Sequence, residues 1–358
     1  MTGEGSRKRK TMCPPTNAIE EMRHYFALRA RRYANALRGC PAARALDYVP
    51  YIAAMAHIKD IGALDVLDAF GGTGFLSEGL NFDPGRVVIA DCTPEMMEGV
   101  THALGVRREA IADDFDNMAN RYEGAFDVVL SHGGLHHAIA LTDEGLVDAE
   151  ESMRKQCRVI ENLCRCLRPG GLMVLGDIPA PGSRNRRGEG LSLNCLDRVD
   201  SHIAAEPVRT ELQGIAQRFL HGNLSVVNID AAFRASDPRP DIPVPAYFFD
   251  NFVAKRTHLG HKANYPDFDV LIAVAERNGM IMEWGIDYRG PWLFSDRNTA
   301  GWYFREKFSI GTEGARGAHA EENTQMMKEL REYLGVQEIA ERCLVNWGVY
   351  YSCLRRTE

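Results

Sequence analysis

Short apolar runs alternate with longer polar or amphipathic segments from residue 65 onward. Five of these runs predict β-strands, at residues 66–70, 86–91, 109–113, 126–131 and 171–177. Within these runs, apolar residues are adjacent rather than at every second position, which is typical of parallel strands covered on both faces. The pattern therefore predicts a doubly wound α/β domain, in which ligands bind beyond the carboxyl ends of the strands.

Helical spacing precedes and follows these strands. From Asn17 to Leu37, apolar residues recur at intervals of three and four, and Asn17 and Glu20 are spaced as a capping box. Such a helix could pack on the body or close over a cleft, and packing is the favoured interpretation. Further helices are expected at 42–58, 197–220, 267–278, 297–308 and 321–334. Residues 280–288 and 343–354 are expected to form an antiparallel hairpin that completes a seven-stranded sheet.

These elements divide the chain into four parts. Residues 1–16 form a basic tail that is expected to be disordered, and residues 17–60 form the N-terminal helices. The core comprises residues 61–180 and 265–358, with a helical insertion near 290–340, and residues 181–264 are expected to form a substrate lid. Four aromatic residues of the insertion are expected in the core, with the pocket as the less favoured alternative: Trp292, Trp302, Tyr303 and Phe304.

The composition narrows the class of protein. The 358 residues are 45% hydrophobic and 25% charged, as in a globular chain that can bury a full core. The net charge is −7, and because basic residues gather near the start, the body is more acidic still, which argues against a nucleic-acid substrate. No segment is long and apolar enough for a membrane helix, and no apolar signal sequence follows the basic start. Nine cysteines without a C-x-x-C pair favour a reducing cytoplasm.

The first predicted strand leads into a glycine-rich turn. Asp68 is followed by Phe70, Gly71, Gly72 and Gly74, and then by a short helix. Glycines let the backbone turn sharply and approach a ligand, and a helix start offers free amides to an anion. The second strand ends at Asp91, where a carboxylate can accept hydrogen bonds from the two hydroxyls of a ribose. Together they predict a site for a nucleotide-like cofactor.

A dehydrogenase is the first alternative for such a turn. Its fingerprint would read Gly72-x-Gly74-x-x-Ser77, with serine where glycine or alanine is required. No later segment supplies a hydride-transfer site, so this alternative is disfavoured.

The series of motifs resembles the class I S-adenosylmethionine-dependent methyltransferases. The resemblance covers residues 60–180 and rests on VLDAFGGTGFLSEGL, on Asp91, on the run Asp113-Asp114-Phe115, on FDVVLSHGGLHH and on CRCLRPGGLMVLGD. It implies a Rossmann-like seven-stranded sheet with N-terminal helices and helical lid insertions. The cofactor that it implies is S-adenosylmethionine.

The resemblance also implies roles for individual residues. The turn from Asp68 to Gly74 would hold the methionine part of the cofactor, and Asp91, beside Cys92, would bind the ribose. Asp113 or Asp114, with Phe115, would flank the adenine, and Ser131 and His132 after the fourth strand complete the expected site. Phe70 stands where the family usually has glycine, which puts the path of the loop near the methionine carboxylate in question.

Histidines are the next candidates for chemistry. The resemblance implies that His136 and His137 are scaffold residues rather than catalytic ones, whereas His132 could be either. Several potential metal ligands could meet only through the fold, namely His132, His136, Asp177, His202, His221, His258 and His261. Because no tight spacing supports a metal site, none is predicted.

Methyl transfer from a sulfonium is an in-line displacement, in which alignment and exclusion of water can supply most of the catalysis. An alcohol, phenol or carbon acid also needs a base, for which His261 and His132 are the candidates, and Tyr265 could orient the acceptor. The acceptor is expected to be a small molecule, such as a 2-oxo acid, methylated on carbon or oxygen in specialised natural-product metabolism. A non-methylating, cofactor-binding regulatory protein is the alternative, and a homodimer is one oligomeric state left open.

Overall fold

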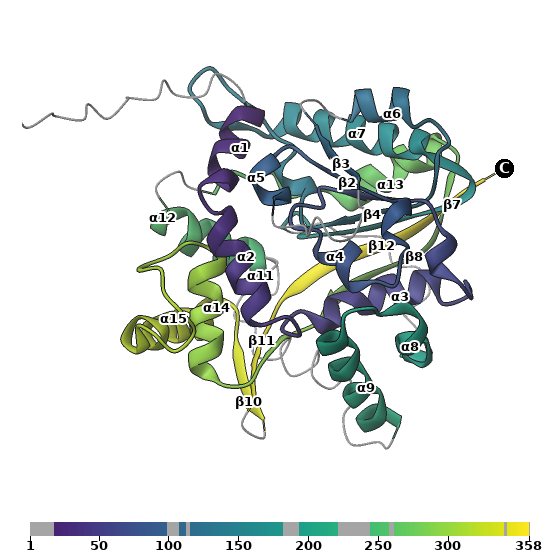
Figure 1. Cartoon of the computed structure of the whole chain (residues 1–358). Coiled ribbons are helices and arrows are strands. Elements are labelled where there is room, and N and C mark those ends of the chain that lie inside the picture. The colour runs from purple at the N-terminus through teal and green to yellow at the C-terminus, as the bar shows by residue number, and fades with distance from the viewer. Residues whose placement is uncertain are drawn as a thin grey trace, which may run out of the picture.

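A twisted seven-stranded sheet forms the centre of the molecule (Figure 1). The computed structural model describes residues 18–98, 107–111, 115–181, 193–220, 244–257, 261–339 and 342–357. The strands lie in the order β3-β2-β1-β4-β7-β12-β8, and all pairs are parallel except those that β12 makes with β7 and β8. The predicted doubly wound, Rossmann-like sheet of seven strands is therefore confirmed.

The strands of this sheet lie close to the apolar runs that predict them. Their bounds are β1 (Val66–Ala69), β2 (Val87–Asp91), β3 (Arg107–Ala110), β4 (Phe126–His132), β7 (Leu167–Asp177), β8 (Met280–Arg289) and β12 (Gly348–Arg356). The central strands β1 and β4 are buried along almost their whole length, as unbroken apolar runs require. Strand β3 begins two residues before the predicted run.

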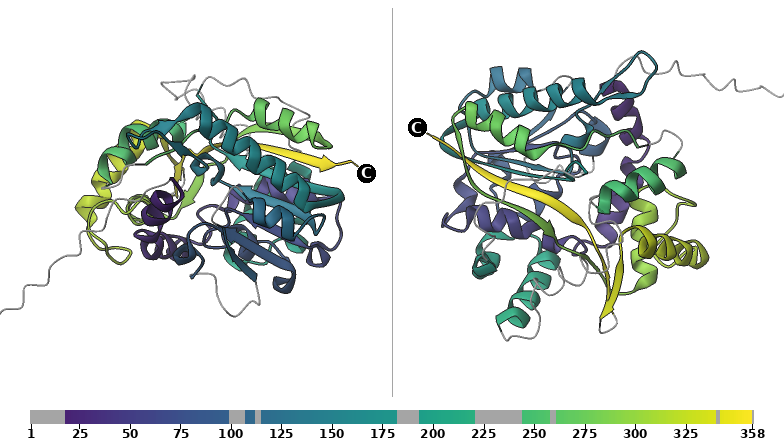
Figure 2. Two further views of the ribbon diagram at one scale, coloured as in Figure 1. Left: turned by 90° about the horizontal axis from the view of Figure 1, so that it is seen from above. Right: turned by 180° about the vertical axis from the view of Figure 1, so that it is seen from behind.

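Helices cover both faces of the sheet. One face is covered by α6 (Asp116–Arg121), α7 (Ala149–Cys166) and α13 (Phe268–Arg277), and Figure 2 shows α7 and α13 side by side over it. The other face carries α3 (Val49–Met55), which follows the 3₁₀ turn η1 (Ala45–Tyr48), together with α4 (Phe75–Gly79) and α5 (Pro94–Met97). A separate hydrophobic core lies on each face.

The N-terminal helix is broken. The structure has α1 (Ala18–Ala27) and α2 (Ala30–Gly39) in place of one helix over 17–37, and the predicted cap at Asn17 lies outside the described residues. At the break, the Arg29 amide bonds to the carbonyl of Phe26, three residues earlier instead of four. The bend accompanies burial of the Arg29 side chain, which reaches the carbonyl of Lys307.

The last predicted strand is two strands. Residues 342–345 form β11 (Arg342–Val345), which lies between β10 (Val336–Ile339) and β9 (Trp292–Phe294) in a small antiparallel sheet, whereas β12 starts at Gly348. The chain leaves one sheet and enters the other at Asn346 and Trp347. The prediction of one strand over 343–354 is wrong, because a continuous apolar run does not show where the chain changes sheets.

Helices of an insertion pack against this small sheet. The insertion before β10 contains α14 (Arg297–Lys307) and α15 (Ala320–Tyr333), near the positions predicted for them. The remaining helices and short strands are η2 (Ile61–Ala63), η3 (Pro84–Arg86), η5 (Leu135–His137), β5 (Ala140–Leu141), β6 (Val147–Asp148), η6 (Leu193–Arg198), α8 (Val199–His202), α9 (Glu206–Leu220), α11 (Val244–Phe248), the π-helical η7 (Phe249–Val253) and α12 (Ala254–Arg256). Among the described residues, no helix combines the length and apolarity needed to cross a membrane.

Candidate active site

The glycine-rich turn after β1 has the sharp backbone that its sequence predicts. Gly72 and Gly74 have φ angles of 50° and 75°, in the left-handed region that glycine adopts without strain. At Gly71, a Cβ atom would lie 2.7 Å from the Ile89 side chain and 2.8 Å from the Asp68 carboxyl carbon. Only glycine fits at this point, so the loop is pressed against the ends of β1 and β2.

Phe70 keeps the backbone of the glycine that it replaces. Its φ angle is 58°, which is costly for a residue with a Cβ atom. The ring packs edge-to-face on Phe115, with 5.0 Å between centroids, and the Phe70 side chain occupies the space in which Gly134 has no Cβ. The loop therefore follows the turn expected for glycine, and packing of the ring offsets the strain.

Two carboxylates face this turn, the buried Asp68 and the partly buried Asp91. Asp68 accepts a hydrogen bond from the Ser77 hydroxyl, and Asp91 accepts bonds from the backbone amides of Gly72 (3.0 Å) and Thr93 (2.8 Å). Burial raises the pKa of Asp68 to about 7 and that of Asp91 to about 6. Hydrogen-bond donors only partly offset this effect, so both carboxylates would gain from a cationic or hydroxyl-bearing ligand.

A cavity lies between the turn and the N-terminal helices. It encloses about 800 Å³, part of it open to solvent. Seven of the expected cofactor residues line it: Asp68, Phe70, Gly71, Gly72, Asp91, Cys92 and His132. Gly74 is the N-cap residue of α4, and Phe115 is buried and packs against the Phe70 ring. Ser131 is buried in β4 and is not among the lining residues, and Asp113 and Asp114 lie outside the described residues.

A second chamber adjoins the first. Both cavities are lined by Phe26, Tyr33, Arg44, His132, Gly133 and His137. Its aromatic wall consists of Phe249 from η7, Trp292 from β9, Phe308 after α14 and Trp347 between β11 and β12. Of the four insertion aromatics considered for the pocket, Trp292 lines it, whereas Trp302, Tyr303 and Phe304 belong to the core.

Three basic side chains line the second chamber: Arg29, Arg44 and Lys307. Arg44 is paired with the buried Asp47 at 2.7 Å. Arg29 and Lys307 have no carboxylate partner among the described residues, and the Lys307 ammonium group lies over the Trp292 ring, 4.3 Å from its centroid. Burial, reinforced by the charge of Arg44, holds the pKa of Lys307 well below its usual value. The chamber therefore holds two basic groups, Arg29 and Lys307, whose cationic forms lack a carboxylate counter-charge among the described residues.

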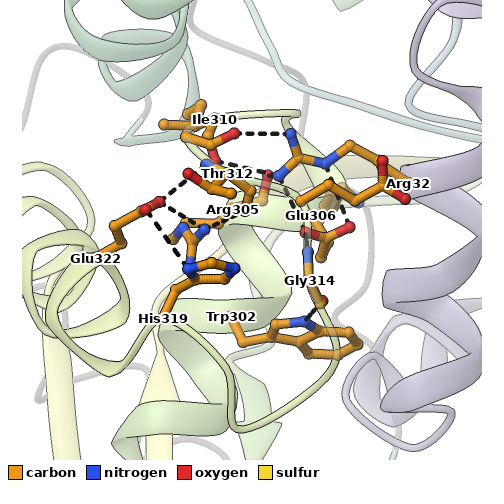
Figure 3. Close-up of polar contacts among 12 residues, drawn as sticks. Arg32, Trp302, Arg305, Glu306, Ile310, Thr312, Gly314, His319 and Glu322 are labelled. Carbon is orange, nitrogen blue, oxygen red and sulfur yellow. Dashed lines mark hydrogen bonds and ion pairs between the residues drawn. The ribbon is translucent and has the colours of Figure 1, made fainter.

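The N-terminal helices are fastened over these cavities by the C-terminal insertion (Figure 3). Arg32 of α2 makes an ion pair with Glu306 of α14 at 3.0 Å and donates to the carbonyls of Arg305 and Ile310, both at 3.2 Å. Arg305 in turn pairs with Glu322 of α15 at 2.6 Å. We name this group the α2–α14 clasp. Because α1 and α2 supply Met22, Phe26 and Tyr33 to the cavities, the helices close over the cleft as well as packing on the body.

His132 lies where the two cavities meet, but its ring nitrogens are occupied. Nδ1 lies 3.1 Å from the Tyr51 hydroxyl and 3.3 Å from that of Tyr351, and Nε2 lies 3.5 Å from an Asp47 oxygen. Burial, then the charge of Arg44, lowers the pKa of His132. This geometry suits a neutral, firmly positioned imidazole.

His261 differs from the other two expected catalytic residues. Both its ring nitrogens are buried and lack a hydrogen-bond partner, and it lines the second chamber. Burial holds its pKa well below the usual range, so the ring is neutral near pH 7. The Tyr265 hydroxyl instead donates to Asp250 at 2.8 Å, and Tyr265 is not among the residues lining either cavity.

Several lining residues were not singled out from the sequence. Met22, Phe26 and Tyr33 have the spacing of a packing face, and Arg29 and Lys307 resemble solvated helix charges. Buried charges cannot be identified from local pattern, because the contact between Arg29 and Lys307 joins positions 278 residues apart. For Trp347, the sequence contained one indication that the strand is interrupted, because Asn346 and Gly348 flank it inside an apolar run.

Comparison with known proteins points to one family. Residues 67–175 match the model of a family described as a methyltransferase domain. No curated protein sequence matches the chain. Similar solved structures include the YcgJ protein of Bacillus subtilis, with 13% identity, 87% of this chain and 99% of that chain covered, and a TM-score of 0.39. Phosphoethanolamine N-methyltransferase 2 of Haemonchus contortus, in complex with phosphomonomethylethanolamine and S-adenosylhomocysteine, has 11% identity, coverage of 94% and 60%, and a TM-score of 0.45. The [4+2]-cyclase SpnF has 11% identity, coverage of 86% and 80%, and a TM-score of 0.39.

The first cavity has the donor and acceptor groups that S-adenosylmethionine requires. Its two carboxylates, Asp68 and Asp91, suit a molecule with an ammonium group, a sulfonium and a ribose diol. The bare backbone of Gly71 and Gly72 leaves room beside them. Together with the order of the sheet, these features agree with the family model that residues 67–175 match, so this part of the chain is a methyltransferase domain of the class I, S-adenosylmethionine-dependent kind, for which S-adenosylmethionine is the cofactor.

Proposed function

We propose that this methyltransferase transfers the methyl group of S-adenosylmethionine to carbon or oxygen of a small organic anion, of the kind handled in natural-product metabolism. The observation that carries the proposal is the second chamber, which is walled by aromatic rings and holds Arg29 and Lys307 without carboxylate partners among the described residues. A carboxylate or phosphate on the acceptor would supply the missing counter-charge.

The arrangement of the two cavities supports a small acceptor. The cofactor, when bound in the first cavity, supplies a methyl group activated by a sulfonium. His132 and Gly133 line both cavities, so an acceptor in the second chamber would face the cofactor across this junction. The N-terminal helices and the α2–α14 clasp enclose the acceptor and exclude water, which favours in-line displacement.

Removal of a proton from the acceptor is assigned to His261, because the other two candidates are occupied. The neighbours of His132 occupy both its nitrogens, and the Tyr265 hydroxyl is bound to Asp250. His261 presents a neutral imidazole with unpartnered nitrogens to the chamber. A lone pair in this position can accept a proton from the acceptor or bind an ion that lowers the acceptor's pKa.

The proposal is tested by incubating the full chain with trideuteromethyl S-adenosylmethionine and a fractionated metabolite extract of its native cell. We expect a labelled small molecule that an anion exchanger retains. Lys307→Met should raise KM for that acceptor more than it lowers kcat, whereas Lys59→Met, at an exposed position, should behave like the unaltered protein. Label found on neutral molecules, protein or RNA would overturn the proposal. Cofactor binding without any labelled product would instead favour the non-methylating alternative.

A further inference from the structure

Three histidines from two separate segments meet in the wall of the second chamber. His136 and His137 belong to η5, after β4, and His261 comes from the segment that precedes α13. One ring nitrogen of each lies within 4.8 Å of those of the other two. The ring centroids are 4.0 Å apart for His136 and His137, and 5.0 Å apart for His137 and His261.

Contacts at Nδ1 orient two of these rings, those of His136 and His137. Nδ1 of His136 lies 2.5 Å from a carboxylate oxygen of Asp177, and the other oxygen of Asp177 accepts the His136 amide at 3.0 Å. Nδ1 of His137 lies 3.3 Å from the carbonyl of Lys262. A carboxylate or carbonyl on Nδ1 fixes the tautomer and leaves Nε2 with a free lone pair, as is usual for metal-binding histidines.

Three of the remaining ring nitrogens are buried and have no hydrogen-bond partner. Nε2 of His136 and both nitrogens of His261 are closed to solvent and have no hydrogen-bond partner. An unsatisfied buried polar atom destabilises the folded protein, so three in one cluster require an explanation. A histidine cluster with a purely structural role would use these nitrogens in hydrogen bonds. A bound cation would satisfy the nitrogens facing the common point.

We propose that His136, His137 and His261 bind a divalent transition-metal ion such as Zn²⁺, with Asp177 as the carboxylate that orients His136. Three imidazoles are an established ligand set for zinc, and they leave at least one coordination position open. This inference departs from the sequence-based expectation of no metal, because the fold supplies the convergence that the spacing lacks.

The open position would face the chamber that the three histidines line with Phe249 and Arg29. Since Arg29 repels a cation, the site should hold its ion best when an anionic ligand completes the coordination. Only the role of the ion rests on the proposed function, under which it would bind an oxygen of the acceptor and lower the pKa of the acidic group. Binding of the ion itself is independent of methyl transfer.

The test uses the full chain after treatment with a chelator and dialysis. Zn²⁺ is added, excess is removed, and bound metal is measured by inductively coupled plasma mass spectrometry. We expect about one equivalent in the unaltered protein and in His57→Gln, which changes an exposed histidine. His137→Gln and His261→Gln, checked for folding by circular dichroism, should each weaken Zn²⁺ binding about tenfold or more.

X-ray absorption at the zinc edge of the unaltered protein supplies evidence that needs no variant. Scattering from three imidazoles is expected. The proposal is overturned if the unaltered protein retains no zinc, if both variants retain as much as His57→Gln, or if the spectrum lacks imidazole scattering. Because neither measurement involves an acceptor, zinc binding without methyl transfer would reject the proposed function alone.

Discussion

The rings of Phe70 and Phe115 meet edge-to-face with 5.0 Å between their centroids, and both residues have positive φ angles, 58° and 68°. Two non-glycine residues in the left-handed region thus pack against one another at the first cavity, which Phe70 lines. Each such backbone costs of the order of 1 to 3 kcal/mol, which the packing of the rings must offset. The departure at Phe70 from the family's usual glycine is therefore accommodated by a partner 45 positions later in the chain.

This relationship predicts an unusual order of stability at position 70. Phe70→Ala removes the ring and keeps the strain, whereas Phe70→Gly removes the ring and the strain. Phe70→Gly should therefore be more stable than Phe70→Ala by about 1 kcal/mol, the reverse of the order found at ordinary positions. Urea unfolding of the two variants measures the difference, and a more stable alanine variant would contradict the strain at Phe70.

The raised pKa values of Asp68 and Asp91 predict that cofactor affinity depends on pH. In the free protein, burial raises the pKa of Asp68 to about 7 and that of Asp91 to about 6, whereas the cations of S-adenosylmethionine favour the ionised forms. Protons therefore compete with the cofactor, and affinity should fall as the pH falls from about 8 to about 5, by up to tenfold per unit for each protonated group. Calorimetry at constant ionic strength measures this dependence.

The same shifts have the opposite effect on the free protein. A carboxylate whose pKa is raised by folding contributes stability that is fully present below its ordinary pKa of 3.8. This contribution is lost progressively as the pH rises to the folded pKa, which is about 6 for Asp91 and about 7 for Asp68. The dependence of cofactor affinity on pH can be divided between the two carboxylates with Asp68→Asn. In this variant, only protonation of Asp91, with a pKa of about 6, should lower the affinity as the pH falls. An unchanged profile in that variant would show that Asp68 does not titrate in this range.

Removal of the Asp91 carboxylate should weaken cofactor binding directly. Asp91→Ala loses the expected hydrogen bonds to the ribose and frees the Gly72 amide, at a cost of about 1 to 3 kcal/mol in binding free energy. Asp91→Asn retains one acceptor oxygen and should lose less. Glu144→Ala, at an exposed position, serves as the control. Equal affinity of Asp91→Ala and the control would reject the ribose role.

Two adjacent arginines give a matched test of the α2–α14 clasp. Arg32→Ala leaves Glu306 buried without its partner, which should cost about 3 kcal/mol of stability and raise KM for the acceptor. The ion pair between Arg31 and Glu313 is exposed, with 79% of the Arg31 side chain open to solvent, so Arg31→Ala should change little. Thermal unfolding measures the stability of both variants. Equal losses of stability in Arg32→Ala and Arg31→Ala would contradict a specific contribution of the α2–α14 clasp.

His261→Ala should separate turnover from cofactor binding. Whether His261 accepts a proton or binds an ion, its loss should lower kcat about tenfold or more, while the affinity for S-adenosylmethionine stays the same. His57→Ala is the control at an exposed site. Full activity of His261→Ala would remove this residue from the chemistry, and lost cofactor affinity would indicate a structural defect.

The parts of the fold that could be predicted from sequence are those set by local pattern. The runs before Asp68 and Asp91 are apolar throughout because parallel strands are buried on both faces, and the glycine turn follows from backbone geometry. The split between β11 and β12 could not be predicted, because Trp347 leaves the strand pattern to stack on Trp292, with 4.1 Å between centroids, a contact made only in the folded chain.

The candidate site likewise has one half that could be predicted from sequence and one half that could not. Its cofactor half lies in one stretch of sequence, and most residues expected there line the first cavity. Its second half joins Arg29 from the N-terminal helices, Lys307 from the insertion and the three-histidine cluster, whose positions are set by packing between distant segments. Burial and convergence of such residues depend on tertiary contacts that periodicity does not encode.

The α2–α14 clasp joins residues near the beginning of the chain to residues near its end. A protein is synthesised from its N-terminus, so the cofactor turn can fold long before Lys307 and Trp347 have emerged from the ribosome. Until then, α1 and α2 lack the surface that holds them over the cleft. The acceptor chamber is therefore completed only after the cofactor turn, together with β12, which follows Trp347 and pairs with β7 and β8 in the main sheet.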